Sequence, residues 1–127
     1  MLFRSQQFHN LGLSYYGRKH EDLGRYKITK DAADVGRFKT ASLREVARTA
    51  PYMHNGLIPS LDEVIQMYDA GMARPKPRKD QENDPLFPTT DPLLQKLSLT
   101  KEERAALKAF LLTLNSPAKR EKMPELP

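Results

Sequence analysis

GRFKTASLREVARTAPYMHNGLIPSLDEVIQMYDAG, the stretch from Gly36 to Gly71, contains two start signals for helices. Each signal is a capping box, in which a serine hydroxyl and a glutamate three residues later satisfy free backbone amides reciprocally. The two boxes are Ser42 with Glu45 and Ser60 with Glu63. The stretch therefore predicts two short helices, one after each serine.

The apolar residues that follow each serine recur every three or four positions, which is typical of an amphipathic helix. They are Leu43, Val46, Ala47 and Ala50 in the first segment, and Leu61, Val64, Ile65 and Tyr68 in the second. Pro51 cannot continue a helix, so the first one should end after about two turns. Gly71 should end the second, because glycine readily adopts the left-handed conformation that closes a helix.

A third helix is predicted near the C-terminus. Thr100 and Glu103 form another capping box, and the strongest apolar stripe follows it, at Leu107, Phe110, Leu111 and Leu114. The sequence Asn115-Ser116-Pro117 should break that helix. A shorter helical turn is expected after Thr90, because Asp91 and Pro92 suit a first turn.

The remaining sequence reads as loop. The segment from Ala73 to Thr90 is polar and contains four prolines, and the first forty residues are punctuated by glycines. No segment alternates polar and apolar residues as a strand would. At 127 residues we expect one mainly α-helical domain over residues 1–114, with long connecting loops and a tail over residues 115–127.

The chain is basic, with a net charge of +5, but its lysines and arginines are scattered. Dense runs occur only at Arg74 to Lys79 and Lys119 to Lys122. We expect these runs to be solvated surface rather than a nucleic-acid interface, because no nucleic-acid reading motif accompanies them. No window approaches the ~18 apolar residues of a membrane span, and the first ten residues lack the apolar core of a signal peptide.

Common catalytic motifs are absent. The sequence has no G-x-S-x-G, P-loop, H-E-x-x-H or dinucleotide-binding glycine pattern. It has no cysteine, so it cannot contain C-x-x-C-H, which covalent attachment of a c-type haem requires. The three histidines are far apart in the sequence, so a metal cluster built from them is not expected.

Several segments nevertheless resemble a known family. They are FHNLGL (8–13), DLGRYKIT (22–29), GRFKT and SLREVA within 36–47, TAPYMHNG (49–56) and LTKEERAALKAFLLTL (99–114). Together they resemble the C-terminal haem domain of bacterial di-haem cytochrome c peroxidases and their MauG-like relatives. Ala41 departs from the family pattern, which usually has proline there.

The resemblance implies a cytochrome c-like helical domain that lacks its first, haem-attaching helix. In this family the C-x-x-C-H normally stands shortly upstream of the segment matching FHNLGL. We therefore interpret the chain as a fragment or truncated product of a periplasmic enzyme that carries two c-type haems and reduces hydrogen peroxide or oxidises an organic substrate. This domain would relay electrons to the peroxidatic haem. The chain alone should carry no covalent haem and should be inactive.

Tyr68 is the candidate distal ligand of the haem iron. The resemblance implies this role, because the matching residue is methionine in the peroxidases and tyrosine in MauG-like members. Helical geometry also places Tyr68 on the apolar face, whereas Met67 points about 100° away. The alternative is a core tyrosine with a hydrogen-bonded hydroxyl.

The resemblance implies further roles for residues near the haem edge. His54, Lys39 and Arg44 would lie there, with the alternatives of a loop-anchoring histidine and solvated basic side chains. Thr49 and Pro51 match positions whose backbone carbonyls help to hold a calcium ion between the two haem domains. An ordinary helix end leading into a proline turn is the alternative.

The expected partners follow from the same resemblance. They are the N-terminal haem domain of the parent protein and a small electron-donor protein. We also expect self-association, because a missing first helix would leave an apolar face open, and large apolar patches are rare on monomers. A rival hypothesis from another functional class is a haem-less basic module that binds an acidic protein or a nucleic acid.

Overall fold

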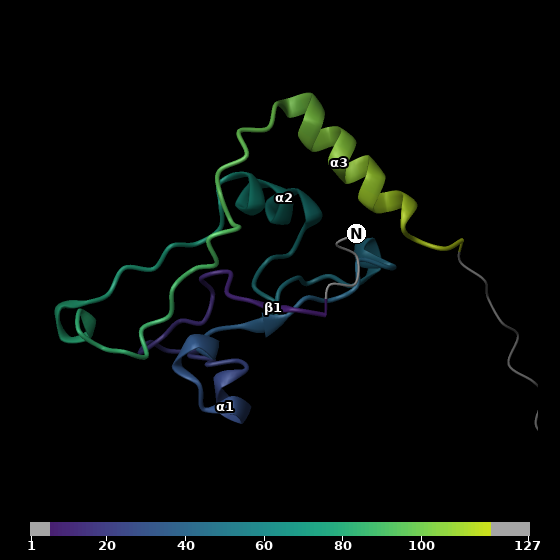
Figure 1. Cartoon of the computed structure of the whole chain (residues 1–127). Coiled ribbons are helices and arrows are strands. Elements are labelled where there is room, and N and C mark those ends of the chain that lie inside the picture. Colours follow the sequence, from purple (N-terminus) through teal and green to yellow (C-terminus); the bar gives the residue numbers. More distant parts are fainter. Residues whose placement is uncertain (1–5, 118–127) are drawn as a thin grey trace, which may run out of the picture.

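The computed structural model describes residues 6–117, which form a small domain with three helices and much loop (Figure 1). The helices are α1 (Tyr26–Thr29), α2 (Leu61–Asp69) and α3 (Lys101–Thr113). Two short strands are present, β1 (Phe8–His9) and β2 (Phe38–Lys39). Three single 3-10 turns complete the elements: η2 (Ala32–Asp34), η3 (Val46–Arg48) and η4 (Lys79–Gln81). No helix in this described part is long and apolar enough to cross a membrane.

The predicted starts of α2 and α3 are confirmed. The Thr100 hydroxyl accepts from the Glu103 N–H at 3.2 Å, and the Glu103 carboxylate accepts from the Thr100 N–H at 2.8 Å, which completes a capping box. At α2 the Ser60 hydroxyl accepts from the Glu63 N–H at 3.3 Å, whereas the Glu63 carboxylate accepts from that hydroxyl. Only half of the predicted box therefore forms at α2.

Gly71 ends α2 as predicted. Its φ is +86°, and its N–H donates to the Tyr68 carbonyl at 3.0 Å. The next residue, Met72, donates its N–H to the Met67 carbonyl at 2.8 Å. This pair of hydrogen bonds is the Schellman motif, and it fixes the last turn of α2, where Tyr68 lies.

The helix predicted after Ser42 is wrong. Only η3 forms there, because Glu45 adopts a left-handed conformation with φ 59°. Its N–H donates to the Leu114 carbonyl at 3.1 Å, and its carboxylate accepts from the Ser116 N–H at 2.7 Å. Contacts with the end of α3 thus replace the local capping box.

The expectation of no strand is also wrong, although β1 and β2 have only two residues each. They pair antiparallel, with Phe8 opposite Lys39 and His9 opposite Phe38. Two residues are too few to show an alternating pattern. Where a short helical turn is predicted after Thr90, the structure has a single turn, closed by the Leu94 N–H donating to the Asp91 carbonyl at 3.0 Å.

The main apolar core lies between α2 and α3. Leu61, Ile65 and Leu111 are buried there, with Leu43, Val46, Ala47, Tyr52 and Leu114 packed against them. We call residues 43–71 and 97–117 the helical region. We call residues 8–40 and 73–91 the latched region, in which the long loop carrying η4 extends to one side of the molecule (Figure 1).

Candidate functional site

The end of α2 holds Tyr68 in a fixed position. The Schellman motif fixes one side of this turn. On the other side Asp69, the residue after Tyr68, joins α2 to the segment that leads into α3. The Asp69 carboxylate accepts from the Leu99 N–H at 2.7 Å, and the Asp69 carbonyl accepts from the Leu97 N–H at 2.9 Å. The backbone that carries Tyr68 is therefore restrained on two sides.

Tyr68 is more exposed than the other residues of its apolar stripe. Its side chain is 36% exposed, whereas Leu61 and Ile65 are buried. Its hydroxyl has no hydrogen-bond partner among residues 6–117, so the geometry differs from that of a core tyrosine with a bonded hydroxyl. Neighbouring atoms still desolvate the ring, and this raises the pKa of the Tyr68 phenol above its usual value.

Apolar side chains on α3 also remain uncovered. Leu107 and Phe110, both on the predicted stripe, are exposed, and Phe110 is exposed by 45%. Leu111 alone of the four stripe residues is fully buried against α2, with Leu114 partly buried beside it. The stripe of α3 is therefore wider than the surface that α2 covers.

His54 stacks on Phe38 of β2. The ring centroids are 3.6 Å apart and the ring planes are 13° from parallel. Burial lowers the pKa of His54, and the positive charge of Lys27 adds to this effect, whereas Asp22 opposes it. His54 is thus held between the helical and latched regions, where its lowered pKa favours the neutral form. The sequence analysis did not single out Phe38, although its place in the FKT segment could have suggested it.

The two basic candidates lie in different surroundings. Lys39 follows Phe38 in β2 and is exposed. Arg44 is exposed at the approach to η3, and its N–H donates to the Ser42 hydroxyl at 3.2 Å. Lys39 therefore shares a strand with the stacking partner of His54, while Arg44 belongs to the segment that contacts α3.

Thr49 and Pro51 flank the turn that follows η3. The Thr49 hydroxyl donates to the Val46 carbonyl at 3.0 Å, and the Ala50–Pro51 peptide bond is cis. The carbonyls of Thr49 and Pro51 accept no hydrogen bond from residues 6–117. That part of the chain also contains no group of three or more histidine, aspartate or glutamate side chains that could hold a metal. A cation at these carbonyls would need further ligands.

Comparisons with known proteins show what the chain is similar to. No family model matches the chain. It is 41% identical over 104 residues to the cytochrome c peroxidase IdrP2 of Pseudomonas sp. (strain SCT), covering 82% of this chain and 24% of that protein. It is 32% identical over 127 residues to the methylamine utilization protein MauG of Methylorubrum extorquens, covering 98% of this chain and 31% of that protein.

A solved structure shares the fold. It is the crystal structure of a MauG-like protein associated with microbial copper homeostasis, with a TM-score of 0.70 and 36% identity over 89% of this chain and 36% of that one. The chain is therefore homologous to a portion of the di-haem cytochrome c peroxidases and MauG proteins, as the sequence resemblance predicted. It spans about a quarter to a third of the length of these relatives.

The family uses haem c. This chain has no cysteine, so none of its residues can form the thioether bonds of a c-type haem. Within residues 6–117 the phenol at the end of α2 and apolar side chains on α3 remain partly exposed.

Proposed function

We propose that this chain forms the C-terminal haem-domain portion of a MauG-like di-haem oxidoreductase, with a cytochrome c-like fold. The observation that carries the proposal is the homology over most of the chain, combined with the unpaired hydroxyl of Tyr68 at the restrained end of α2. In this role the domain relays electrons to a peroxidatic haem in the other half of the enzyme.

The described residues fit a haem. A porphyrin is a large apolar plane, and the exposed side chains of Leu107 and Phe110 are apolar surface that such a plane would remove from water. Tyr68 would hold the iron on the distal side, with His54, Lys39 and Arg44 at the haem edge. The bound haem would supply reversible one-electron transfer.

The Tyr68 hydroxyl must lose its proton before its oxygen can bind iron. Because burial raises the pKa of this phenol, the chain by itself holds that proton at neutral pH. A ferric ion is the kind of local positive charge that lowers the pKa of a ligand and favours the phenolate. Proton release from Tyr68 should therefore accompany haem binding, and the phenolate should favour the ferric state.

Haem attachment requires polypeptide outside these 127 residues, because they contain no thiol. We propose that the C-x-x-C-H and its proximal histidine come from such a segment, and that the N-terminal haem domain completes the enzyme in the periplasm. A small donor protein would deliver electrons. The Thr49 and Pro51 carbonyls would contribute to a calcium site between the two haem domains.

The reaction of the whole enzyme would be reduction of hydrogen peroxide or oxidation of an organic substrate. A tyrosine at position 68 favours the MauG-like type, because the resemblance assigns methionine to the peroxidases at this position. The test is the axial ligand of the ferric iron in the assembled, haem-loaded enzyme.

Tyr68→Phe removes the ligating oxygen and keeps the volume of the ring, so packing should change little. We expect the ferric absorption and electron paramagnetic resonance spectra to change from six-coordinate to five-coordinate high spin. Met67→Leu is the matched control on the neighbouring residue and should leave both spectra unchanged. Unchanged spectra for Tyr68→Phe, or a change for Met67→Leu, would contradict the assignment.

We also propose that the chain associates with itself when no haem covers its apolar face. Analytical ultracentrifugation of the 127-residue chain should then show a concentration-dependent dimer or larger species. Phe110→Ser should shift the equilibrium toward monomer, because it removes an apolar contact from the open face. Ile28→Ser is the control, since Ile28 is 85% exposed on α1, outside this face. A monomer at every concentration would refute this proposal.

A further inference from the structure

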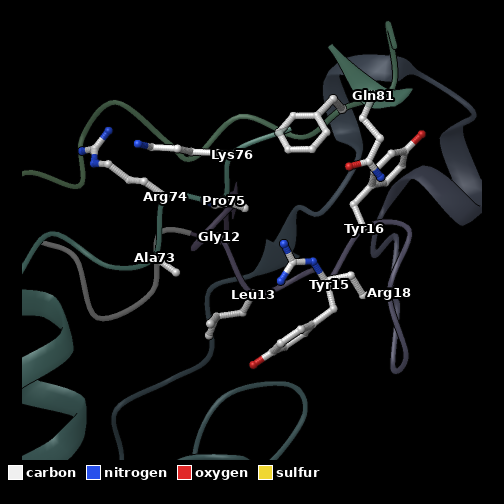
Figure 2. A pocket seen from close by; sticks show the side chains of 11 residues that line it. Gly12, Leu13, Tyr15, Tyr16, Arg18, Ala73, Arg74, Pro75, Lys76 and Gln81 are labelled. Carbon is white, nitrogen blue, oxygen red and sulfur yellow. The ribbon is translucent and has the colours of Figure 1, made fainter. Parts of the chain in front are cut away.

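A second feature of the molecule lies in the latched region, where a cavity of about 270 Å³ separates two loop segments. One wall comes from residues 12–18, and the other comes from Ala73, Arg74, Pro75 and Lys76 together with Gln81 and Phe87 (Figure 2). Pockets for drug-sized ligands measure roughly 300–1,000 Å³, so this cavity suits an occupant of about one ring.

Two side-chain hydrogen bonds hold the two walls together, from Arg78 and from Tyr16, and a third, from Thr90, closes the base of the loop wall on itself. The Thr90 hydroxyl donates to the Ala73 carbonyl at 2.7 Å, the Arg78 guanidinium donates to the Gly17 carbonyl at 3.0 Å, and the Tyr16 hydroxyl donates to the Asp84 carboxylate at 2.6 Å. The cavity is therefore formed before any ligand arrives, which lowers the entropic cost of binding.

The lining is largely aromatic and apolar. Tyr15, Tyr16 and Phe87 contribute rings, and Leu13 and Pro75 contribute aliphatic surface. Tyr16 and Phe87 already pack edge to face, with centroids 5.8 Å apart and planes at 79°. Aromatic rings prefer such offset or edge-to-face neighbours, so the lining favours an aromatic occupant over an aliphatic one.

The charged groups at the cavity are cationic. Arg18 and Lys76 both line it, and neither side chain has an ion-pair or hydrogen-bond partner among residues 6–117. Arg74 is already engaged, because its guanidinium donates to the Leu94 carbonyl. No carboxylate lines the cavity. Figure 2 shows the Arg18 side chain on the wall of residues 12–18, with Lys76 on the opposite, loop wall.

We propose that this cavity binds an aromatic monocarboxylate, with the ring against the side chains of Tyr16 and Phe87 and the carboxylate on Arg18. A guanidinium presents a planar pair of N–H donors that matches a carboxylate. Lys76 adds a second positive charge at the rim. None of the lining residues belongs to the end of α2 or to α3, so this proposal can be tested independently of the proposed electron-transfer role.

Benzoate is the probe, titrated into the isotopically labelled 127-residue chain and followed by amide chemical shifts. We expect saturable shifts confined to the amides of the residues that line the cavity, within 12–18 and 73–76 and at Gln81 and Phe87, with a Kd on the order of 1 mM for so small a ligand. Benzamide keeps the ring and removes the charge, and acetate keeps the charge and removes the ring. Both should bind several-fold more weakly than benzoate.

Arg18→Gln tests the anchor, and Lys19→Gln is the matched control, since Lys19 is an exposed neighbour that does not line the cavity. Arg18→Gln should weaken benzoate binding by roughly 3- to 10-fold, the range for a charge-assisted contact at a partly open site. Lys19→Gln should leave it unchanged. Equal binding of benzamide, equal effects of the two variants, or shifts spread over the basic surface would overturn the proposal.

Discussion

The latched and helical regions are stabilised in different ways. In the latched region the chain segments are joined by polar contacts across long sequence separations, such as His9 with Asp91 at 2.6 Å and Asn10 with the Thr89 carbonyl at 2.9 Å. In the helical region a small apolar core of Leu61, Ile65 and Leu111 joins α2 to α3. Long-range hydrogen bonds occur in both regions, but the apolar cluster between α2 and α3 belongs to the helical region.

The two regions also differ in what they leave exposed. Many of the polar groups of the latched region find partners inside it. Desolvation raises the pKa of Asp91, but the hydrogen bonds from His9 and from the Leu93 N–H outweigh it and hold that pKa below its usual value. The helical region instead leaves Tyr68, Leu107 and Phe110 exposed. The exposed surface of the helical region is therefore largely apolar, which is what the proposed haem contact requires.

The largest effect is expected from Leu111→Ala, which tests the apolar core. Removing a buried leucine leaves a cavity and should lower the free energy of unfolding by roughly 2–5 kcal/mol. Leu112→Ala is the control on the next residue, 48% exposed, and should change it by about 0.5 kcal/mol or less. Urea unfolding followed by circular dichroism measures both. Similar losses for the two variants would mean that the α2–α3 core does not stabilise the fold.

Gly12→Ala tests the junction of the latched region. Gly12 has φ +77°, and an added Cβ would lie 1.9 Å from the Ala73 carbonyl oxygen. The left-handed conformation alone costs roughly 1–3 kcal/mol for a residue with a side chain, and the backbone clash adds to it. We expect a loss of about 2 kcal/mol or more, together with faster hydrogen exchange at residues 73–76.

Gly56→Ala is the matched control for Gly12→Ala. Gly56 has a similar φ of +64°, but its nearest neighbour would be a side-chain atom, Pro51 Cγ at 3.2 Å. This variant carries the conformational strain with little clash, so it should be less destabilising. If the two variants lose equal stability, the close approach of Gly12 to Ala73 is not what joins the walls.

Thr100→Ala removes the hydroxyl that caps α3 in the helical region. The expected loss is about 1 kcal/mol, the usual contribution of an N-cap side chain. Thr113→Ala serves as control, because Thr113 is exposed at the other end of α3, where its hydroxyl bonds only the Phe110 carbonyl. Thermal unfolding of both variants gives the difference. An equal effect at both ends would contradict a capping role for Thr100.

The smallest effect is expected from Tyr16→Phe, and it should depend on pH. The hydrogen bond to Asp84 raises the pKa of Tyr16 to about 12, and the same bond lowers the pKa of Asp84 below 3.8. A raised tyrosine pKa stabilises the fold up to the unfolded-state pKa near 10 and loses this effect as pH rises toward 12. A lowered aspartate pKa stabilises the fold above 3.8 and loses this effect in more acid solution.

The stability difference between the wild type and Tyr16→Phe should therefore be constant across the neutral range and shrink at both extremes of pH. Tyr26→Phe is a suitable control, because no hydrogen bond of the Tyr26 hydroxyl is seen among residues 6–117. Unfolding curves collected across pH provide the measurement. A difference that does not vary with pH would show that the Tyr16–Asp84 bond is absent in solution.

The sequence predicted α2 and α3 well because their signals are local. A cap, an apolar stripe and a stop residue lie within one short segment, as at Ser60, Ile65 and Gly71. The same reasoning predicted a helix at Ser42 and Glu45 that does not form, although this capping box has the same two residue types at the same spacing as Ser60 and Glu63. There the Glu45 carboxylate bonds the Ser116 N–H, a contact 71 residues away that no local pattern contains.

For the candidate site, the sequence by itself determined the family and the absence of a thiol, because both follow from residue identities alone. It also placed Tyr68 on the apolar stripe of α2, because helical periodicity fixes direction. Only the tertiary structure decided that Tyr68 remains partly exposed, that His54 stacks on Phe38 and that residues 12–18 enclose a cavity with residues 73–76. These features depend on which distant segments meet, and side-chain packing and long-range hydrogen bonds decide that only when the whole chain folds.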